Sequence, residues 1–161
     1  NYYELIYKNR VQNLYTFMIW ISIPLIVFTS LFSDWIINIL FGAEYLDAIP
    51  ILIIHIWSYI FVCMGVVSTN WFITENLQIY QLINAGIGAV LNILLNIVFL
   101  KNYGLIGAAY STLISYGIAS YLLNIIWKPT RPHFLIQSKS FINLNIYNEI
   151  DFKKIFFKKN Y

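Results

Sequence analysis

The stretch NLQIYQLINAGIGAVLNILLNIVFL, from Asn76 to Leu100, decides the fold of this 161-residue chain. It contains no Asp, Glu, Lys or Arg. A helix needs about 20 predominantly apolar residues to cross the hydrocarbon core of a bilayer, and this stretch exceeds that length. Its apolar residues do not alternate with polar ones, as the strands of a membrane β-barrel require. The stretch therefore predicts a membrane-spanning helix at 79–100.

Three further uncharged stretches have the same character, and they cover residues 11–33, 48–74 and 102–127. Overall, 60% of the residues are hydrophobic and 11% are charged, whereas a soluble domain carries about 25% charged residues. Inside lipid, helices satisfy every backbone polar group within the segment. We therefore expect an all-α membrane protein with four transmembrane helices. The other three predicted spans are 14–32, 48–67 and 105–127.

Charge placement divides the chain into a lead-in at 1–13, a transmembrane region at 14–127 and a basic tail at 128–161. The tail carries seven Lys or Arg residues and two acidic residues. Basic residues favour the cytoplasmic side, and four spans return the chain to its starting side. Lys101 in the third connection argues the other way, but the tail charges outweigh it. We expect both termini in the cytoplasm and a water-exposed tail.

The connections contain residues that are typical of helix ends. Ser33 is a suitable N-cap for a short interfacial helix, and Gly42 is suited to end that helix. Pro24 is expected to kink the first span. We expect a loop at 68–77 and a tight turn at 101–104.

Three asparagines, Asn84, Asn92 and Asn96, lie on a shared face of the predicted span 79–100. An unpaired amide in lipid is costly, so this face should contact protein or a water-filled path. One interpretation is hydrogen bonding between helices, at about 0.6 kcal/mol per contact. The other is the lining of a substrate path. Small residues at 85–89 and 104–111 predict close packing of the third and fourth spans.

Among Asp, Glu, Lys, Arg and His, His55 is the only residue within a predicted span, and Cys63 is the single cysteine. Histidines inside membranes are candidates for substrate contact or proton transfer. The alternative is that His55 lies close to the membrane surface. We count it with the three asparagines as a substrate-path candidate.

The sequence contains no catalytic grouping, glycine-rich phosphate loop or HExxH motif. We therefore expect no enzymatic activity, no cofactor and no metal site. Residues 150–161 combine phenylalanines with four lysines, a composition that favours an anionic membrane surface. Nothing in the sequence resembles a nucleic-acid-binding fold.

Two motifs resemble those of polysaccharide-export flippases. LFGAEYLDA, at 40–48, is similar to the family's LFG-x-x-Y-x-x-A connection. NILLN at 92–96, followed by YGLIGAAYST at 103–112, is similar to its N-x-x-L-N and G-x-x-G-A-A-x-x-T helix pair. The family belongs to the multidrug, oligosaccharidyl-lipid and polysaccharide exporter superfamily. The resemblance covers about residues 5 to 127.

The resemblance implies that the four spans form part of the C-terminal lobe of a larger helical transporter. Such a transporter moves a polyprenyl-diphosphate-linked oligosaccharide across the bacterial cytoplasmic membrane by alternating access of two lobes. The expected partners are the bilayer, this lipid-linked oligosaccharide and an N-terminal lobe of the same protein. This sequence departs from the family in lacking that lobe, and its spans contain no Lys or Arg that could meet the diphosphate.

Three alternatives remain open: a drug or cation antiporter of the same superfamily, a four-span accessory protein, and a glycan-modifying membrane enzyme. An enzyme should carry paired ionisable residues at one membrane face, and His55 stands alone. The coding sequence upstream of Asn1 separates the transporters from the accessory protein, because either further spans or a start codon precede it.

Overall fold

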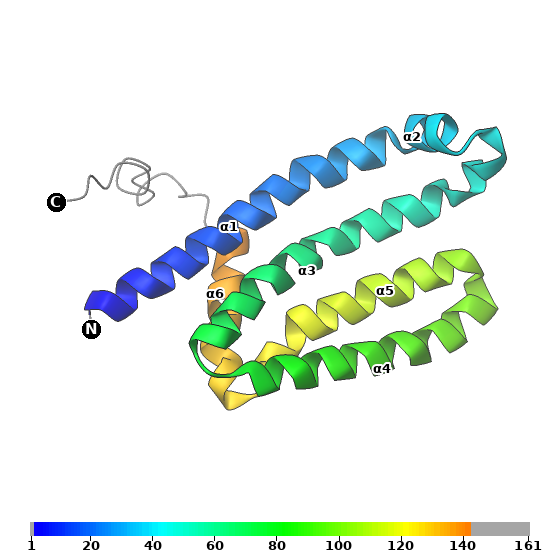
Figure 1. Ribbon diagram of the computed structural model, residues 1–161. Coiled ribbons are helices and arrows are strands. Elements are labelled where there is room, and N and C mark those ends of the chain that lie inside the picture. Colours follow the sequence, from blue (N-terminus) through cyan, green and yellow to red (C-terminus); the bar gives the residue numbers. More distant parts are fainter. Residues whose placement is uncertain (1, 143–161) are drawn as a thin grey trace.

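The computed structural model describes residues 2–142, and every regular element within them is helical. The long helices are α1 (Tyr2–Leu31), α3 (Ile49–Thr74), α4 (Gln78–Tyr103) and α5 (Leu105–Ser120). In Figure 1 these helices lie lengthwise beside one another, with α5 between α3 and α4. The described part contains four helices that are long and apolar enough to cross a membrane. The predicted all-α membrane fold with four transmembrane helices is confirmed.

Helix α1 begins at Tyr2. It therefore includes most of residues 1–13, which we expected to be a polar lead-in before the first span. Lys8 Nζ lies 2.7 Å from Glu4 Oε1, one turn away, and both side chains are exposed. Solvent weakens such a pair, so it adds little to stability. Pro24 lies inside α1, which nevertheless continues as one helix to Leu31.

The connection after α1 contains the expected short helix, α2 (Ser33–Leu40), followed by a 3-10 turn, η1 (Ala43–Ala48). Ser33 is not its N-cap, since Phe32 holds that position and the Ser33 hydroxyl donates to the Ser30 carbonyl at 3.0 Å. Gly42 ends the helix as predicted: its φ is 94°, and its N–H donates to the carbonyls of Ile37 and Asn38. A positive φ is readily adopted by glycine.

Helix α3 is longer than predicted, because it continues to Thr74 through most of the segment expected to be a loop. The turn to α4 is only three residues, Glu75 to Leu77. Asn76 adopts a φ of 56°, and the Leu77 N–H donates to the Phe72 carbonyl at 2.8 Å. This is the pattern of a helix that ends in a left-handed residue, where Asn is an accepted substitute for Gly. The predicted loop at 68–77 is therefore wrong for residues 68–74, which belong to α3.

Beyond α5 the chain bends instead of continuing as one α-helix to Trp127. Two 3-10 turns follow, η2 (Leu122–Ile125) and η3 (Lys128–Thr130), and then helix α6 (Arg131–Ile142). The prediction of a water-exposed tail is wrong for α6, because one of its faces packs against the bundle. The expectation for residues 150–161 lies outside the described residues.

The core lies between α1, α3 and α6. Its buried apolar members are Val11, Tyr15, Ile19, Met64, Val67, Trp71, Phe72 and Ile136. Lipid tails are as apolar as these side chains, so burial from lipid provides no hydrophobic gain, and close packing and hydrogen bonds hold the helices together. The core is therefore important for its shape and its polar contacts as much as for its apolar area.

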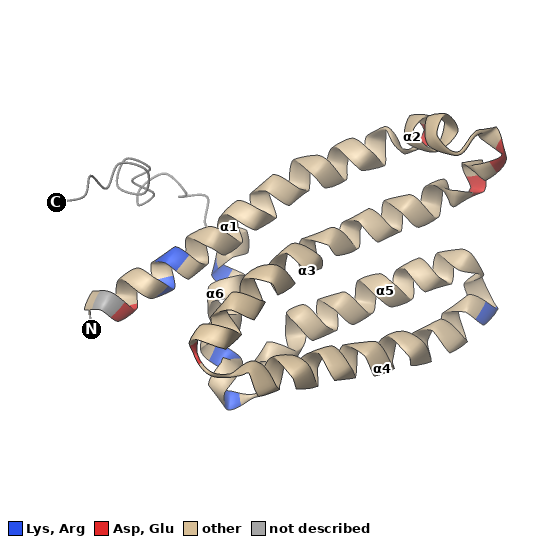
Figure 2. Cartoon of the chain, viewed as in Figure 1, with Lys and Arg blue, Asp and Glu red and all other residues tan. Residues whose placement is uncertain are grey.

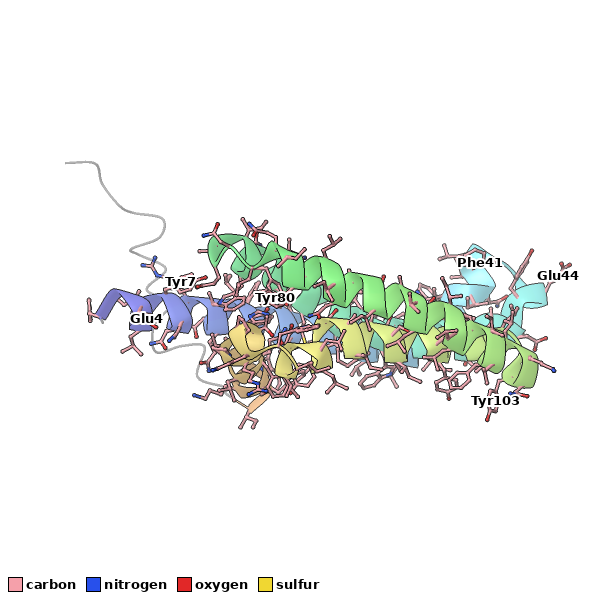
Figure 3. The ribbon with its side chains drawn as sticks, turned by 90° about the horizontal axis from the view of Figure 1, so that it is seen from below. Glu4, Tyr7, Phe41, Glu44, Tyr80 and Tyr103 are labelled. Carbon is pink, nitrogen blue, oxygen red and sulfur yellow. The ribbon has the colours of Figure 1, made fainter. Side chains whose placement is uncertain are left out.

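The outer surface of the long helices is rich in exposed apolar side chains, as expected of helices that face lipid. Charged residues gather at the two ends of the bundle (Figure 2). Figure 3 shows Glu4 and Tyr7 at one end, and Phe41, Glu44 and Tyr103 at the other. The first end also carries Lys8, Arg10 and the basic residues around α6, and we call it the basic end (Figure 2).

Candidate functional site

Close packing of α4 against α5 depends on two glycines. A Cβ atom at Gly88 would lie 2.6 Å from the Ala119 Cβ, which is closer than real Cβ contacts allow. A Cβ atom at Gly107 would overlap the carbonyl oxygen of Phe99. The predicted close packing of the third and fourth spans is confirmed by these contacts.

A cavity of about 460 Å³ lies between α3, α4 and α5, in the half of the bundle nearer the basic end. Small residues make room for it, among them Gly65 on α3 and Gly88 on α4. Its polar lining residues are Ser68, Gln81, Asn84, Asn92, Thr112, Ser115, Tyr116, Ser120 and Asn124. None of the described residues that line it is charged. We call this space the polar cavity.

The four candidates from the sequence occupy different places. Asn84 is buried at the wall of the polar cavity, and Asn92 also lines it. Asn96 is half-buried and donates to the side-chain oxygen of Asn92 at 3.0 Å, but it is not a lining residue. His55 is exposed on α3 and does not line the cavity. The structure thus places Asn84 and Asn92 at one cavity, joins Asn96 only to Asn92, and leaves His55 apart from all three.

A buried hydrogen-bonding network joins the polar cavity to α6. Near α1, the Tyr15 hydroxyl lies 2.8 Å from Ser68 Oγ of α3 and 3.0 Å from His133 Nε2 of α6. Ser68 Oγ and His133 Nε2 are themselves 3.1 Å apart. Three helices that are distant in sequence therefore meet at one triangle of polar atoms.

Gln137 extends the network from this triangle toward α4. Its amide nitrogen donates to Ser68 Oγ and to the Ser120 carbonyl, each at 3.1 Å. Its amide oxygen accepts from Asn124 Nδ2 at 3.0 Å. Gln137 is fully buried, so each of these bonds replaces a contact with water that the side chain no longer has.

The network ends at Asn84, the residue it shares with the polar cavity. Asn84 Nδ2 donates to Asn124 Oδ1 at 3.0 Å, and Asn84 Oδ1 accepts from the Trp127 indole at 2.9 Å. The Thr130 hydroxyl donates to the Asn124 carbonyl at 2.8 Å. Asn84 therefore forms hydrogen bonds that hold the structure together and also lines the polar cavity. Hydrogen bonding between helices and the lining of a path, the two interpretations given for the asparagines, both apply to it.

His133 lies in an aromatic pocket at the α6 end of the network. Its ring stacks on Trp71 with centroids 4.3 Å apart, and Phe72 and Tyr15 complete the enclosure. Burial lowers the pKa of His133 to about 3, because removal from water disfavours the charged imidazolium. Its Nδ1 atom is buried and has no hydrogen-bonding partner among the described residues. His133 is therefore a neutral structural side chain near pH 7.

The polar cavity can offer neutral hydrogen bonds to a ligand. Ser115 is a lining residue, and its buried hydroxyl has no hydrogen-bonding partner in the described part of the chain. Asn92 retains its own amide nitrogen as a donor in addition to the bond it accepts from Asn96. Across the described residues no group of three or more His, Cys, Asp or Glu could hold a metal ion. The chemistry offered is that of amides and hydroxyls.

Several network residues escaped prediction from the sequence: Tyr15, Ser68, Asn124, His133 and Gln137. The signal available for α6 was the spacing of His133, Ile136, Gln137 and Ser140, which repeats at three and four residues. The predicted water-exposed tail gave no reason to expect a buried face at this spacing. The predicted loop at 68–77 likewise gave no reason to expect a buried Ser68.

Comparison with known proteins gives one relative, whereas no protein-family model and no solved structure matches the chain. The chain is similar to an uncharacterized membrane protein, MJ1068, of Methanocaldococcus jannaschii, with 30% identity over 108 residues. The match covers 67% of this chain and 21% of the relative, so this chain corresponds to about a fifth of the relative's length. This similarity and the four apolar helices together identify a multi-pass membrane protein.

Proposed function

We propose that this chain is the C-terminal part of a flippase that moves polyprenyl-diphosphate-linked oligosaccharide across the bacterial cytoplasmic membrane. The flippase would serve the synthesis of a surface polysaccharide. The proposal starts from the motif resemblance at 40–48 and 92–112. The observation that supports it best is the polar cavity, a partly open space between membrane-spanning helices whose uncharged lining is largely apolar but includes several amide and hydroxyl side chains.

A sugar presents many hydroxyl groups and no charge, and it needs hydrogen-bonding partners wherever it leaves water. Asn92, Thr112 and Ser115 are among the lining residues of the polar cavity, and their side chains carry an amide and two hydroxyls. These groups match the glycan part of the proposed substrate. They match a drug or inorganic cation less well, because a cation in low dielectric requires a carboxylate or several converging oxygens.

The diphosphate part of the substrate needs positive compensation that the cavity does not contain. The described basic residues lie at the ends of the bundle, and Lys101 is at the end opposite α6 (Figure 2). We propose that a second lobe of the same protein contributes the cationic groups and closes against these four helices. Residues 1–161 alone are then not sufficient for transport.

A gene deletion tests the proposed function directly. Export of the cognate glycan should be lost in the deletion strain and restored by the full-length gene, but not by residues 1–161. Normal glycan export in the deletion strain, with changed tolerance to drugs or cations, would contradict the flippase and favour the antiporter. Restoration by residues 1–161 would contradict the requirement for a second lobe.

Two serines on α5 provide a matched test of the polar cavity. Ser115→Ala removes the hydroxyl of a lining residue, which has no hydrogen-bonding partner among the described residues, so stability should hardly change. Glycan transport should fall by roughly 2- to 12-fold if a sugar bonds this hydroxyl, from about 0.5–1.5 kcal/mol per hydrogen bond. Ser111→Ala is the control, because Ser111 is also buried but donates to the Gly107 carbonyl and does not line the cavity. Equal transport by both variants would remove Ser115 from the substrate path.

A further inference from the structure

Helix α6 has two faces of different character. The face toward the bundle holds His133, Ile136, Gln137 and Ser140, all of them buried. The opposite face holds Arg131, Leu135, Lys139 and Ile142, all of them exposed. At 3.6 residues per turn, these four positions fall within about a quarter of the helix circumference. We call them the outer face of α6.

The outer face alternates cations with large apolar side chains. Leu135 is 56% exposed and Ile142 is 85% exposed, while Arg131 and Lys139 lie at its two edges. Water is an unfavourable environment for Leu135 and Ile142, and a hydrocarbon interior is an unfavourable environment for Arg131 and Lys139. The boundary between lipid headgroups and acyl chains suits both, because long cationic side chains reach back to the phosphates.

The position of α6 in the bundle agrees with such a boundary. In Figure 1 α6 runs crosswise to the long helices, near the end that holds the α3–α4 turn. Its contacts with α1 hold it there, as do its hydrogen bonds to Tyr15 and Ser68. Lys8, Arg10 and Lys128 are exposed at the same basic end (Figure 2).

We propose that the outer face of α6 is a docking surface for the headgroup layer of an anionic leaflet. Leu135 and Ile142 reach the first acyl carbons, and Arg131 and Lys139 bind lipid phosphates. The basic end then selects anionic lipids around this helix. The proposal rests on the two faces of α6 and its crosswise position, and it does not depend on transport of a glycan.

The test uses the full-length protein in nanodiscs of phosphatidylcholine, with or without phosphatidylglycerol. A fluorophore on Ile142→Cys, in a Cys63→Ala background, should be quenched by lipids carrying a nitroxide near the headgroup, and more strongly when phosphatidylglycerol is present. Phosphatidylglycerol retained after exchange into detergent is the second readout. It should fall about fivefold for each of Lys128→Gln and Lys139→Gln. Neither lysine side chain has a hydrogen bond within the described residues, so the variants should fold.

Lys101→Gln is the matched control, since it removes the same charge at the opposite end of the bundle and should leave both readouts at this end unchanged. An unquenched fluorophore at position 142 in both lipid mixtures would overturn the proposal, because another part of the protein then covers the face. Equal loss of phosphatidylglycerol in Lys101→Gln would also overturn it. A change in quenching when inorganic phosphate is added to nanodiscs of phosphatidylcholine alone would also overturn the proposal, since it would indicate a site for a small anion.

Discussion

The α1–α3–α6 side of the bundle and the α3–α4–α5 side both bury polar side chains, but they differ in how closely the space around those groups is filled. On the first side, Tyr15, His133 and Gln137 are fully buried and joined to one another or to Ser68. On the second side, the helices enclose a cavity of about 460 Å³, and the Ser115 hydroxyl has no partner among the described residues.

The size of the packing residues explains this difference. Tyr15, Trp71 and Phe72 fill the space between α1, α3 and α6. Between α4 and α5, Gly88 and Ala119 bring the backbones together and leave room beside them. A polar group in a filled region stabilises the fold, whereas one beside open space is available to a ligand. Open space beside a polar residue therefore separates candidate functional from structural residues better than pairing does, since His133 Nδ1 is also unpaired but is closed in by aromatic rings.

The largest expected effect comes from breaking the filled side at Gln137. Gln137→Leu removes the hydrogen bonds that Gln137 makes to Asn124, to Ser68 and to the Ser120 carbonyl. We expect about 3 kcal/mol lower stability, since three buried hydrogen bonds are lost at about 0.5–1.5 kcal/mol each. Thermal unfolding of the purified protein in detergent measures it. Gln78→Leu makes the same chemical change at an exposed position and should alter stability little. Equal stability of the two variants would show that the network does not hold α6.

A smaller effect is expected at the contact between α4 and α5. Gly88→Ala forces a Cβ against Ala119, so we expect about 2 kcal/mol of destabilisation from overpacking. Gly86→Ala, two residues away, has open space at its Cβ and should keep or raise the unfolding temperature through better helix propensity. If both variants unfold at the same temperature, close approach at Gly88 does not determine the packing.

The smallest effect concerns pH and the His133 pocket. Burial depresses the folded-state pKa of His133 to about 3 from an ordinary value of 6.5. Between these two values the unfolded chain binds a proton that the folded chain does not, so stability falls as the pH falls. No charged side chain is recorded in contact with His133, whose described neighbours are Tyr15, Ser68, Trp71 and Phe72.

Lowering the pH from 6.5 to 5.5 should therefore reduce stability by about 1 kcal/mol, from about 1.4 kcal/mol per pH unit well below the ordinary pKa. Denaturant unfolding at several pH values measures this slope. His133→Gln should flatten it, whatever its effect on stability at pH 7. His55→Gln should leave the slope intact, because His55 is exposed. An unchanged slope in His133→Gln would place the titrating group elsewhere.

The sequence alone predicted the four transmembrane helices, because uncharged length is a local property. It also predicted that Gly42 would end α2 and that α4 and α5 would pack closely. It missed the extension of α3 to Thr74, since residues 68–77 contain polar groups that look like a loop until their partners are known. Ser68 is buried there only because Tyr15, His133 and Gln137 arrive from other helices.

The same reason explains the mixed result for the candidate residues. The face of α4 that holds Asn84 and Asn92 follows from helical period, so the sequence could place both toward the interior. That Asn84 is fully paired while Ser115 is not depends on the bend after α5, which brings Asn124 and Trp127 to Asn84. A single sequence does not encode such a bend in any short pattern. His55 was selected for its chemistry, and its exposed place on α3 depends on packing.

The late position of Gln137 in the chain has a consequence for biogenesis. Tyr15, Ser68 and Asn84 are synthesised long before some of their partners, since His133 and Gln137 follow Tyr15 by 118 and 122 positions. Ser68 can bond the Met64 carbonyl and Tyr15 meanwhile, but Asn84 enters the membrane without Asn124 and Trp127, so insertion machinery or water must bond its amide. A ribosome-stalled chain that ends before residue 131 should remain crosslinkable to that machinery through Ser68→Cys. This crosslink should be lost once the whole of α6 has emerged from the ribosome.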